Sequence, residues 1–252
     1  MAEFEDIRAE ASITLATLGE DPRVGLRLAQ RLGCRGVQIS AARPGTRPRD
    51  LDDSGRRDFL AAVKRHELII SGIDAWIRPE DLLDTTRVDV AVSATLDAIR
   101  LAGDMGRVPV SLRLPADDDV VVHEAIAEIT AHAEKIGVRI VDHQVPINDA
   151  VNGVMVGVDP PSWFAAGLDP MDGLSAAVGR LGGVRLADLS AEGMRMPVGG
   201  AESRFDVQAY VLTARVMGYE GLILIDARNW QGTSAEIMAG ISRSLVGIAS
   251  AG

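Results

Sequence analysis

The sequence predicts an α/β fold, a single (β/α)8 TIM barrel that occupies residues 1–252 as one domain. Eight short apolar runs of strand length recur along the chain, and segments with helical spacing separate most of them. A chain of 252 residues without an evident linker has the usual size of such a barrel. A doubly wound open sheet is the main competitor, because local patterns do not show whether a sheet closes. A dinucleotide-binding version is disfavoured, since no G-x-G-x-x-G turn follows the first strand.

The predicted strands are largely continuous apolar runs rather than alternating ones. Parallel strands that are covered on both faces have this pattern. The runs lie at residues 12–18, 36–40, 68–76, 108–114, 138–145, 154–158, 184–189 and 222–227.

Helix signals fill most of the intervals between these strands. Asp21 supplies an N-cap, Pro22 suits the first helical position, and Gly33 ends this first helix. Further helices are predicted at residues 56–66, 88–105, 119–136, 171–181, 206–217 and 234–248, the one at 171–181 ending before Gly182-Gly183. The interval 146–153 is too short for a long helix, and the polar stretch 43–56 indicates a surface loop or lid.

Composition narrows the class of partner. Asp and Glu number 36 against 26 Lys and Arg, a net charge of -10, so the clustered cations of nucleic-acid binding are not expected. The single cysteine, Cys34, excludes an internal disulfide and fits a reducing compartment. The acidic N-terminus does not resemble a signal peptide, and no apolar run approaches the ~20 residues that span a bilayer. We therefore expect a cytoplasmic protein without membrane or nucleic-acid partners. An aromatic content of 4% favours a small substrate over a polymer.

Four aspartates define the candidate site. Functional groups of a barrel project from the C-terminal ends of its strands, and the fifth to eighth predicted strands end in Asp142, Asp159, Asp188 and Asp226. Four converging carboxylates repel one another unless a positive group lies among them. A divalent cation is one solution, and the guanidinium of Arg185 is another. Alternatively, some of these aspartates cap helices or anchor loops.

Six segments carry a resemblance to a known family. They are GCRGVQIS, AEKIGVRIVDHQ, VGVDPPSWFAAGLDP, GVRLADLS, GMRMPVGGAESRFD and GYEGLILIDARN. In this order they resemble the xylose isomerase-like superfamily of TIM barrels, which includes sugar isomerases and epimerases and the endonuclease IV group. The resemblance covers nearly the whole chain. It implies a small polyhydroxylated substrate and a divalent metal held by glutamate, aspartate, histidine and glutamate from strands five to eight.

This chain departs from that metal site. The four ligand positions carry over to Asp142, Asp159, Arg185 and Asp226, so only Asp159 is kept as the same residue. An arginine has no lone pair to give a metal. Our hypothesis is that the Arg185 guanidinium replaces the metal, which requires it to lie within ~4 Å of at least one of the three aspartates. The alternative is a remodelled Mg or Mn site of Asp142, Asp159 and Asp226, assisted by His143 or Asp188.

Two functions follow from the resemblance. The first is a sugar or sugar-phosphate isomerase or epimerase, in which Asp142 and Asp226 are the two bases and Arg185 or a metal stabilises the enediolate. The residues expected to contact its substrate are Arg195, Trp76, His143 and Asp188. The second is a non-catalytic relative that binds a metabolite or partner through an Arg–Asp cluster. An abasic-site endonuclease is disfavoured by 4 histidines and the acidic net charge. Pairing of chains into a homo-oligomer is left open.

Overall fold

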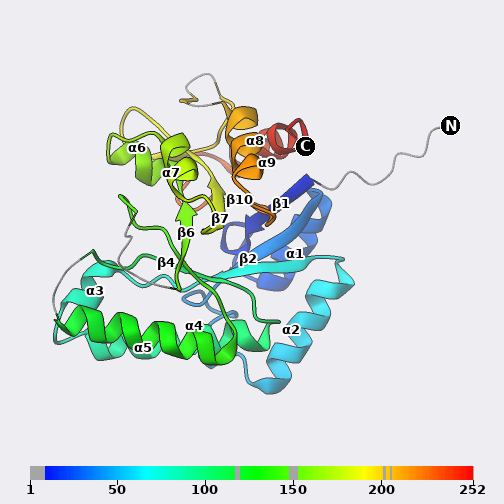
Figure 1. Ribbon diagram of the computed structural model, residues 1–252. Coiled ribbons are helices and arrows are strands. Elements are labelled where there is room, and N and C mark those ends of the chain that lie inside the picture. The colour runs from blue at the N-terminus through cyan, green and yellow to red at the C-terminus, as the bar shows by residue number, and fades with distance from the viewer. Residues whose placement is uncertain (1–8, 117–119, 148–152, 201–202, 205, 252) are drawn as a thin grey trace.

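Eight parallel strands close into a barrel in the computed structural model (Figure 1), which describes residues 9–116, 120–147, 153–200, 203–204 and 206–251. Around the barrel the strands follow the order β1-β10-β7-β6-β5-β4-β3-β2. They are β1 (Ala9–Thr14), β2 (Cys34–Ser40), β3 (Ile69–Asp74), β4 (Val110–Leu112), β5 (Ile140–Asp142), β6 (Met155–Val158), β7 (Leu181–Leu186) and β10 (Ile223–Ile225). The prediction of a (β/α)8 barrel is confirmed, and the open-sheet alternative is excluded because β1 pairs with β10.

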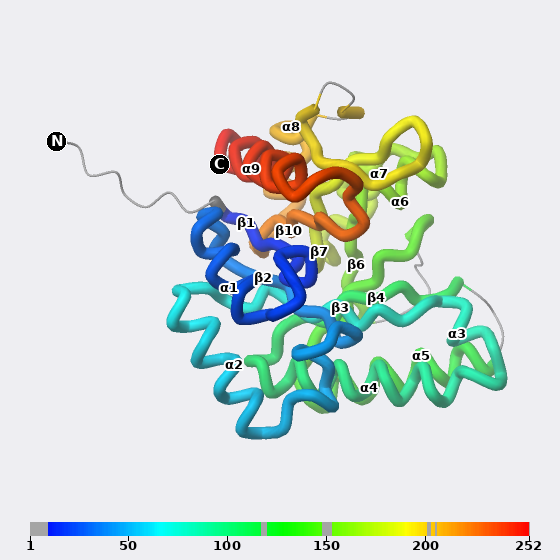
Figure 2. Tube along the Cα trace, turned by 180° about the vertical axis from the view of Figure 1, so that it is seen from behind, coloured from blue at the N-terminus to red at the C-terminus, as the bar shows by residue number. Residues whose placement is uncertain are grey.

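Helices surround the barrel. They are α1 (Pro22–Arg31), α2 (Asp53–Arg65), α3 (Pro79–Leu83), α4 (Val88–Asp104), α5 (Val120–Ile136), α6 (Pro160–Ala165), α7 (Pro170–Ala176), α8 (Val207–Val216) and α9 (Ser234–Ala249), with 3-10 turns η1 (Leu15–Thr17) and η2 (Pro48–Asp50). Both views show α4 and α5 side by side on one flank and α8 beside α9 on another (Figures 1 and 2). Within the described ranges no helix is long and apolar enough to span a membrane.

The main difference from the predicted elements lies between α7 and β7. Gly182 and Gly183 were expected to end a helix, but α7 ends at Ala176 and both glycines belong to β7. Gly182 is needed there for packing, since a Cβ at this position would lie 2.4 Å from the Met155 Cβ on β6. The short helices α3 and α6 were not predicted. The expected loop 43–56 holds η2 and the start of α2. Of the interval 146–153, residues 148–152 lie outside the described part of the chain.

A small two-stranded sheet follows β7 and covers part of the mouth. It consists of β8 (Asp188–Leu189) and β9 (Arg195–Met196), which pair antiparallel. Asp188 is fully buried and anchors the next loop, because its carboxylate accepts hydrogen bonds from Ser203 Oγ at 2.8 Å and from the Arg204 amide at 2.7 Å. This hairpin places Arg195 above the ends of β6 and β10.

Polar side chains fill the interior of the barrel beneath the mouth. A cavity of about 30 Å³ is lined by Ser12, Gln38, Ser111, His143 and Arg185, among others. His143 Nε2 lies 3.4 Å from Ser111 Oγ. A Cβ on Gly157 would lie 2.2 Å from the His143 ring, so a glycine is required on β6 to admit the imidazole.

Candidate functional site at the barrel mouth

Six charged side chains meet at the C-terminal ends of the strands, and we refer to them as the mouth cluster. They are Asp74, Asp159, Asp226, Arg185, Arg195 and Arg228. Asp74 ends β3, while Asp159 and Asp226 directly follow β6 and β10. Three carboxylates are thus matched by three guanidinium groups, and the cluster has no net charge.

Arg195 bridges two of the carboxylates. Its Nη1 and Nη2 donate to Asp159 Oδ2 and Oδ1, both at 2.9 Å, and Nη2 also donates to Asp226 Oδ2 at 2.8 Å. Such a two-pronged contact is the strongest geometry available to an arginine and a carboxylate. Asp159 occupies the N-cap position of α6, but its side chain does not cap the helix. Instead, Ser162 Oγ donates to Asp159 Oδ2 at 2.7 Å.

Arg228 joins the opposite side of the cluster. Its Nε donates to Asp226 Oδ1 at 2.6 Å, its Nη2 to Asp226 Oδ2, and its Nη1 to Asp74 Oδ2. The Arg228 guanidinium also lies over the Trp76 ring, 5.0 Å from the ring centroid. Asp74 ends β3 and Arg228 follows β10, so the strand-end rule includes both as candidates, although it assigned neither of them a role.

Arg185 contributes less to the cluster than the sequence led us to expect. Its Nη1 lies 3.5 Å from Asp226 Oδ2, within the expected 4 Å, but Arg195 and Arg228 make the close contacts to the carboxylates. Arg185 lines the polar cavity inside the barrel, and its Nε has no hydrogen-bond partner in the described part of the chain. Burial, together with the charge of Arg228, lowers the pKa of Arg185.

The arginines keep Asp159 and Asp226 ionised. Burial alone would raise the pKa of each carboxyl group. In Asp159 the charge and hydrogen bonds of Arg195 outweigh burial, and in Asp226 the charges of Arg228 and Arg195 do so. The pKa of both groups is therefore well below its usual range. Asp226, which we expected to be one of two bases, is fully buried and tied to arginine, so it is poorly suited to accept a proton.

Asp142 lies apart from the mouth cluster. Its Oδ1 accepts hydrogen bonds from the backbone amides of Leu114 at 2.9 Å and Gln144 at 3.0 Å. Burial raises the pKa of Asp142 to about 6, although these hydrogen bonds and the charge of Arg113 oppose the rise. Among the described residues, Asp142, Asp159 and Asp226 do not form a group of carboxylates that could hold one metal ion.

Of the four residues expected to contact substrate, two lie at the mouth and two do not. Arg195 and Trp76 line its central cavity. His143 lies inside the barrel, where burial and the charge of Arg185 keep its pKa well below the usual value. Asp188 is occupied by its loop hydrogen bonds. The side chain of His143 turns inward because it follows Asp142 at the end of β5 and packs over Gly157.

The residues present do not fit a divalent metal. In the ranges that the structure describes, no three His, Cys, Asp or Glu side chains converge on one point. The oxygens of Asp159 and Asp226 are taken up by guanidinium groups, and Asp142 Oδ1 is bonded to backbone amides. The expected alternative, a Mg or Mn site of Asp142, Asp159 and Asp226, therefore has no geometric support here.

An open cavity of about 380 Å³ lies directly above the cluster. We call it the arginine lobe, because its lining includes Arg78, Arg113, Arg185, Arg195 and Arg228. The acidic residues in the same lining are Asp74, Glu80 and Asp159, which are fewer than the arginines. Arg78 and Glu80 were not among the candidates found in the sequence, because they lie beyond the strand end, on the approach to and within α3.

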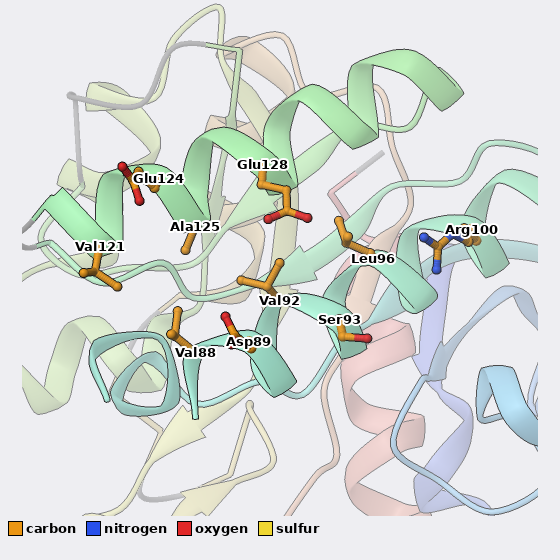
Figure 3. A pocket seen from close by; sticks show the side chains of 10 residues that line it. All are labelled: Val88, Asp89, Val92, Ser93, Leu96, Arg100, Val121, Glu124, Ala125 and Glu128. Atoms are coloured by element: carbon orange, nitrogen blue, oxygen red, sulfur yellow. The ribbon is translucent and has the colours of Figure 1, made fainter. Parts of the chain in front are cut away.

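A separate cavity of about 420 Å³ lies on the outside of the barrel between α4 and α5 (Figure 3). Side chains of the two helices face one another across it, with Val88, Val92 and Leu96 on α4 and Val121 and Ala125 on α5. This groove lies between two outer helices, whereas barrels hold their ligands at the C-terminal ends of the strands.

Comparison with solved structures finds the same fold. A xylose isomerase domain protein from Planctomyces limnophilus is 15% identical, with 96% of each chain covered and a TM-score of 0.68. The 3-keto-D-glucoside 4-epimerase of E. coli is 15% identical, with 95% of this chain and 98% of that chain covered and a TM-score of 0.70. The D-psicose 3-epimerase of Clostridium cellulolyticum H10 is 13% identical, with 96% and 97% covered and a TM-score of 0.69.

The chain spans only part of another similar structure. A fusion of a xylose isomerase-like TIM barrel with a 4-hydroxyphenylpyruvate dioxygenase is 17% identical with a TM-score of 0.69, and this chain covers 42% of it. No protein-family model matches the sequence, and neither does any curated protein. These matches confirm the resemblance at the level of the fold alone: the chain forms a TIM barrel similar to those of the xylose isomerase-like proteins.

Proposed function

We propose that this barrel binds a small, polyhydroxylated, negatively charged molecule in the arginine lobe without the help of a divalent metal. The observation that carries the proposal is the pairing of Asp74, Asp159 and Asp226 with Arg195 and Arg228. The carboxylates that would hold a metal are already neutralised, so hydrogen bonds from guanidinium groups replace metal coordination. This is the metabolite-binding alternative that the sequence left open.

The charge of the lobe indicates the charge of its ligand. The protein as a whole carries a net charge of -10, yet the lobe is lined by more arginines than carboxylates. Arg113 directly follows β4, is exposed, and has no ion pair in the part of the chain that the structure describes. Arg78 lines the same lobe and is paired with Asp81. An unpaired guanidinium beside a neutralised cluster suits a phosphate or carboxylate.

The hydroxyl groups of the ligand are inferred from the fold and from the lining. Two of the structural neighbours are epimerases of D-psicose and of a 3-keto-D-glucoside. Ser162 and Asn229 line the lobe together with the arginines and offer hydrogen-bonding groups of the kind that hydroxyl groups use.

Thermal unfolding of chelator-treated protein tests this function. Saturating Mg, Mn, Co or Zn should leave the melting temperature unchanged, whereas inorganic phosphate should raise it. A ligand at ~100 times its dissociation constant adds roughly 2.7 kcal/mol, a shift of a few degrees. Arg113→Gln should reduce the phosphate effect. Arg27→Gln, a change at an exposed arginine of α1, is the matched control. A selective rise with one metal and none with phosphate would contradict the proposal.

A second candidate is an isomerase or epimerase that transfers a proton without a metal. It is favoured by Asp142, whose raised pKa of about 6 suits a general base near neutral pH. The test is incubation with D-fructose in deuterated water, followed by NMR. Deuterium entering the carbon beside the carbonyl, and its loss in Asp142→Asn, would support this candidate. Binding without deuterium uptake would support the first proposal alone.

A further inference from the structure

A second cavity adjoins the arginine lobe on the other half of the mouth. Its volume is about 540 Å³. We call it the aromatic lobe, since its lining includes Ala16, Ala42, Pro44, Trp76, Trp230 and Ile237. These residues follow β1, β2, β3 and β10 or lie on α9, whereas the arginine lobe lies over β3, β4, β6, β7 and β10. The two lobes therefore divide one barrel mouth between them.

The wall between the lobes is made by residues that line both. These are Trp76, Arg228 and Asn229. Trp76 is 52% exposed, although a large aromatic at a strand end could have packed into the core. Instead, the guanidinium of Arg228 lies over the Trp76 ring, and this guanidinium donates hydrogen bonds to Asp226 and Asp74.

The backbone of this wall is strained at two points. Trp76 has φ 55° and Asn229 has φ 60°, a left-handed conformation that is rare for a bulky aromatic residue. The amide of Trp76 donates to the side chain of Asp74 at 3.4 Å. Strained residues of this kind persist where surrounding structure fixes them, and they gather at ligand sites. Both strained residues border both lobes.

We propose that the two lobes bind the two ends of one amphiphilic ligand. The arginine lobe holds an anionic, hydroxylated head, and the aromatic lobe holds an apolar, ring-containing group attached to it. The contrast in lining carries this assignment. Five arginines line the arginine lobe, whereas two, Arg43 and Arg228, line the aromatic lobe. The aromatic lobe instead has alanine, proline, isoleucine and a second indole, Trp230, in its lining. The exposed face of Trp76 lies at the junction, where it can pack on the linking part of the ligand. This inference rests on the proposed function, because the head group is the one assigned there.

Isothermal titration of the full chain with three probes tests the inference. Inorganic phosphate represents the anionic head alone. Phenyl phosphate adds a ring directly, and 2-phenylethyl phosphate adds a ring on a longer linker. We expect at least one aryl phosphate to bind ten-fold or more tightly than phosphate. Ala42→Trp, at an exposed position of the aromatic lobe, should bring the ratio of the two dissociation constants close to one. Pro44→Trp repeats the test at a second exposed position.

The control is Val90→Trp, on α4, where the side chain is 72% exposed and lines neither lobe. It should retain the wild-type ratio. Phosphate binding without any gain from the ring would overturn the two-lobe assignment and leave the proposed function standing. A gain that survives in both Ala42→Trp and Pro44→Trp would place the ring elsewhere and also overturn it. If none of the three probes binds, the proposed function fails as well.

Discussion

Asp142 and Asp226 end two strands of the same barrel, but their carboxylates meet opposite surroundings. Asp226 is surrounded by guanidinium groups, and its pKa is lowered. Asp142 is also buried, but only two backbone amides and the charge of Arg113 stabilise its carboxylate. These contacts are too weak to offset burial, so the pKa of Asp142 is raised to about 6. Two aspartates that the sequence places equally at strand ends can therefore differ in charge near pH 6.

The raised pKa of Asp142 makes a prediction about stability. The folded state binds this proton more tightly than the unfolded state, whose pKa is 3.8. Below pH 3.8 the carboxyl group is protonated in both states. As pH rises from 3.8 to about 6 the unfolded state loses this proton first, so the folded state becomes increasingly less stable. Asp142→Asn keeps an oxygen that can accept both amide hydrogen bonds but carries no charge. Relative to wild type, this variant should gain about 2 kcal/mol of unfolding free energy between pH 4.5 and pH 7.

Urea unfolding of both proteins at the two pH values measures this gain. The pH dependence of the wild-type unfolding free energy includes contributions from every other titrating group. Only the difference between the variant and the wild type therefore reports on Asp142. A difference that does not change with pH would mean that Asp142 titrates normally in the folded protein.

At the scale of elements, the sequence predicts strands better than the segments that follow them. Each of the eight barrel strands overlaps a predicted apolar run, although the first was expected at 12–18 and forms at Ala9–Thr14. The helices α1, α2, α4, α5, α8 and α9 were recognisable from their helical spacing. The helices α3 and α6 have 5 and 6 residues, too few to show a period. The glycine pair at 182–183 is equally typical of a helix end and of a tightly packed strand, and local sequence does not distinguish them.

The candidate site was predictable in part for the same reason. Asp159 and Asp226 were identified because each directly follows a strand, and this identification does not require knowing how far apart they lie in the fold. That Arg195 rather than Arg185 bridges them depends on how the β8–β9 hairpin folds back over the mouth. Arg195 is separated by 36 positions from Asp159 and by 31 positions from Asp226, and no rule of sequence spacing predicts contacts over such separations.

The packing of β6 on the residue after β5 supplies a prediction at this scale. Gly157→Ala places a methyl group inside the volume of the His143 ring, so we expect a loss of about 2 kcal/mol in unfolding free energy. His143→Ala in the same chain should recover part of it, because the added methyl group then has space. Gly200→Ala is the matched control, since a Cβ at this position would meet no atom within 4 Å, and it should change little. Equal losses with and without His143 would show that the two residues do not compete for space.

For the whole molecule, the mouth cluster links strands that lie on different sides of the barrel. Arg195 joins the ends of β6 and β10, and Arg228 joins β10 to β3. Ion pairs of these two arginines thus tie together the ends of three strands, β3, β6 and β10. The cluster is therefore expected to stabilise the closed barrel and to shape the binding site at once.

Arg195→Met should separate these roles through its dependence on pH. The variant leaves Asp159 and Asp226 buried with less countercharge, and we expect it to lose about 3 kcal/mol at pH 7. In wild type the pKa of Asp159 is below 3.8, so its stabilising contribution is complete at both pH 4.5 and pH 7. In the variant, burial raises the pKa of Asp159, and the carboxyl group takes up a proton as pH falls. The loss should therefore be smaller at pH 4.5 than at pH 7, as urea unfolding would measure. Arg35→Met, which breaks an exposed pair with Glu10, should cost little at either pH. A loss for Arg195→Met that is equal at both pH values would indicate that Arg185 or Arg228 moves to pair with Asp159.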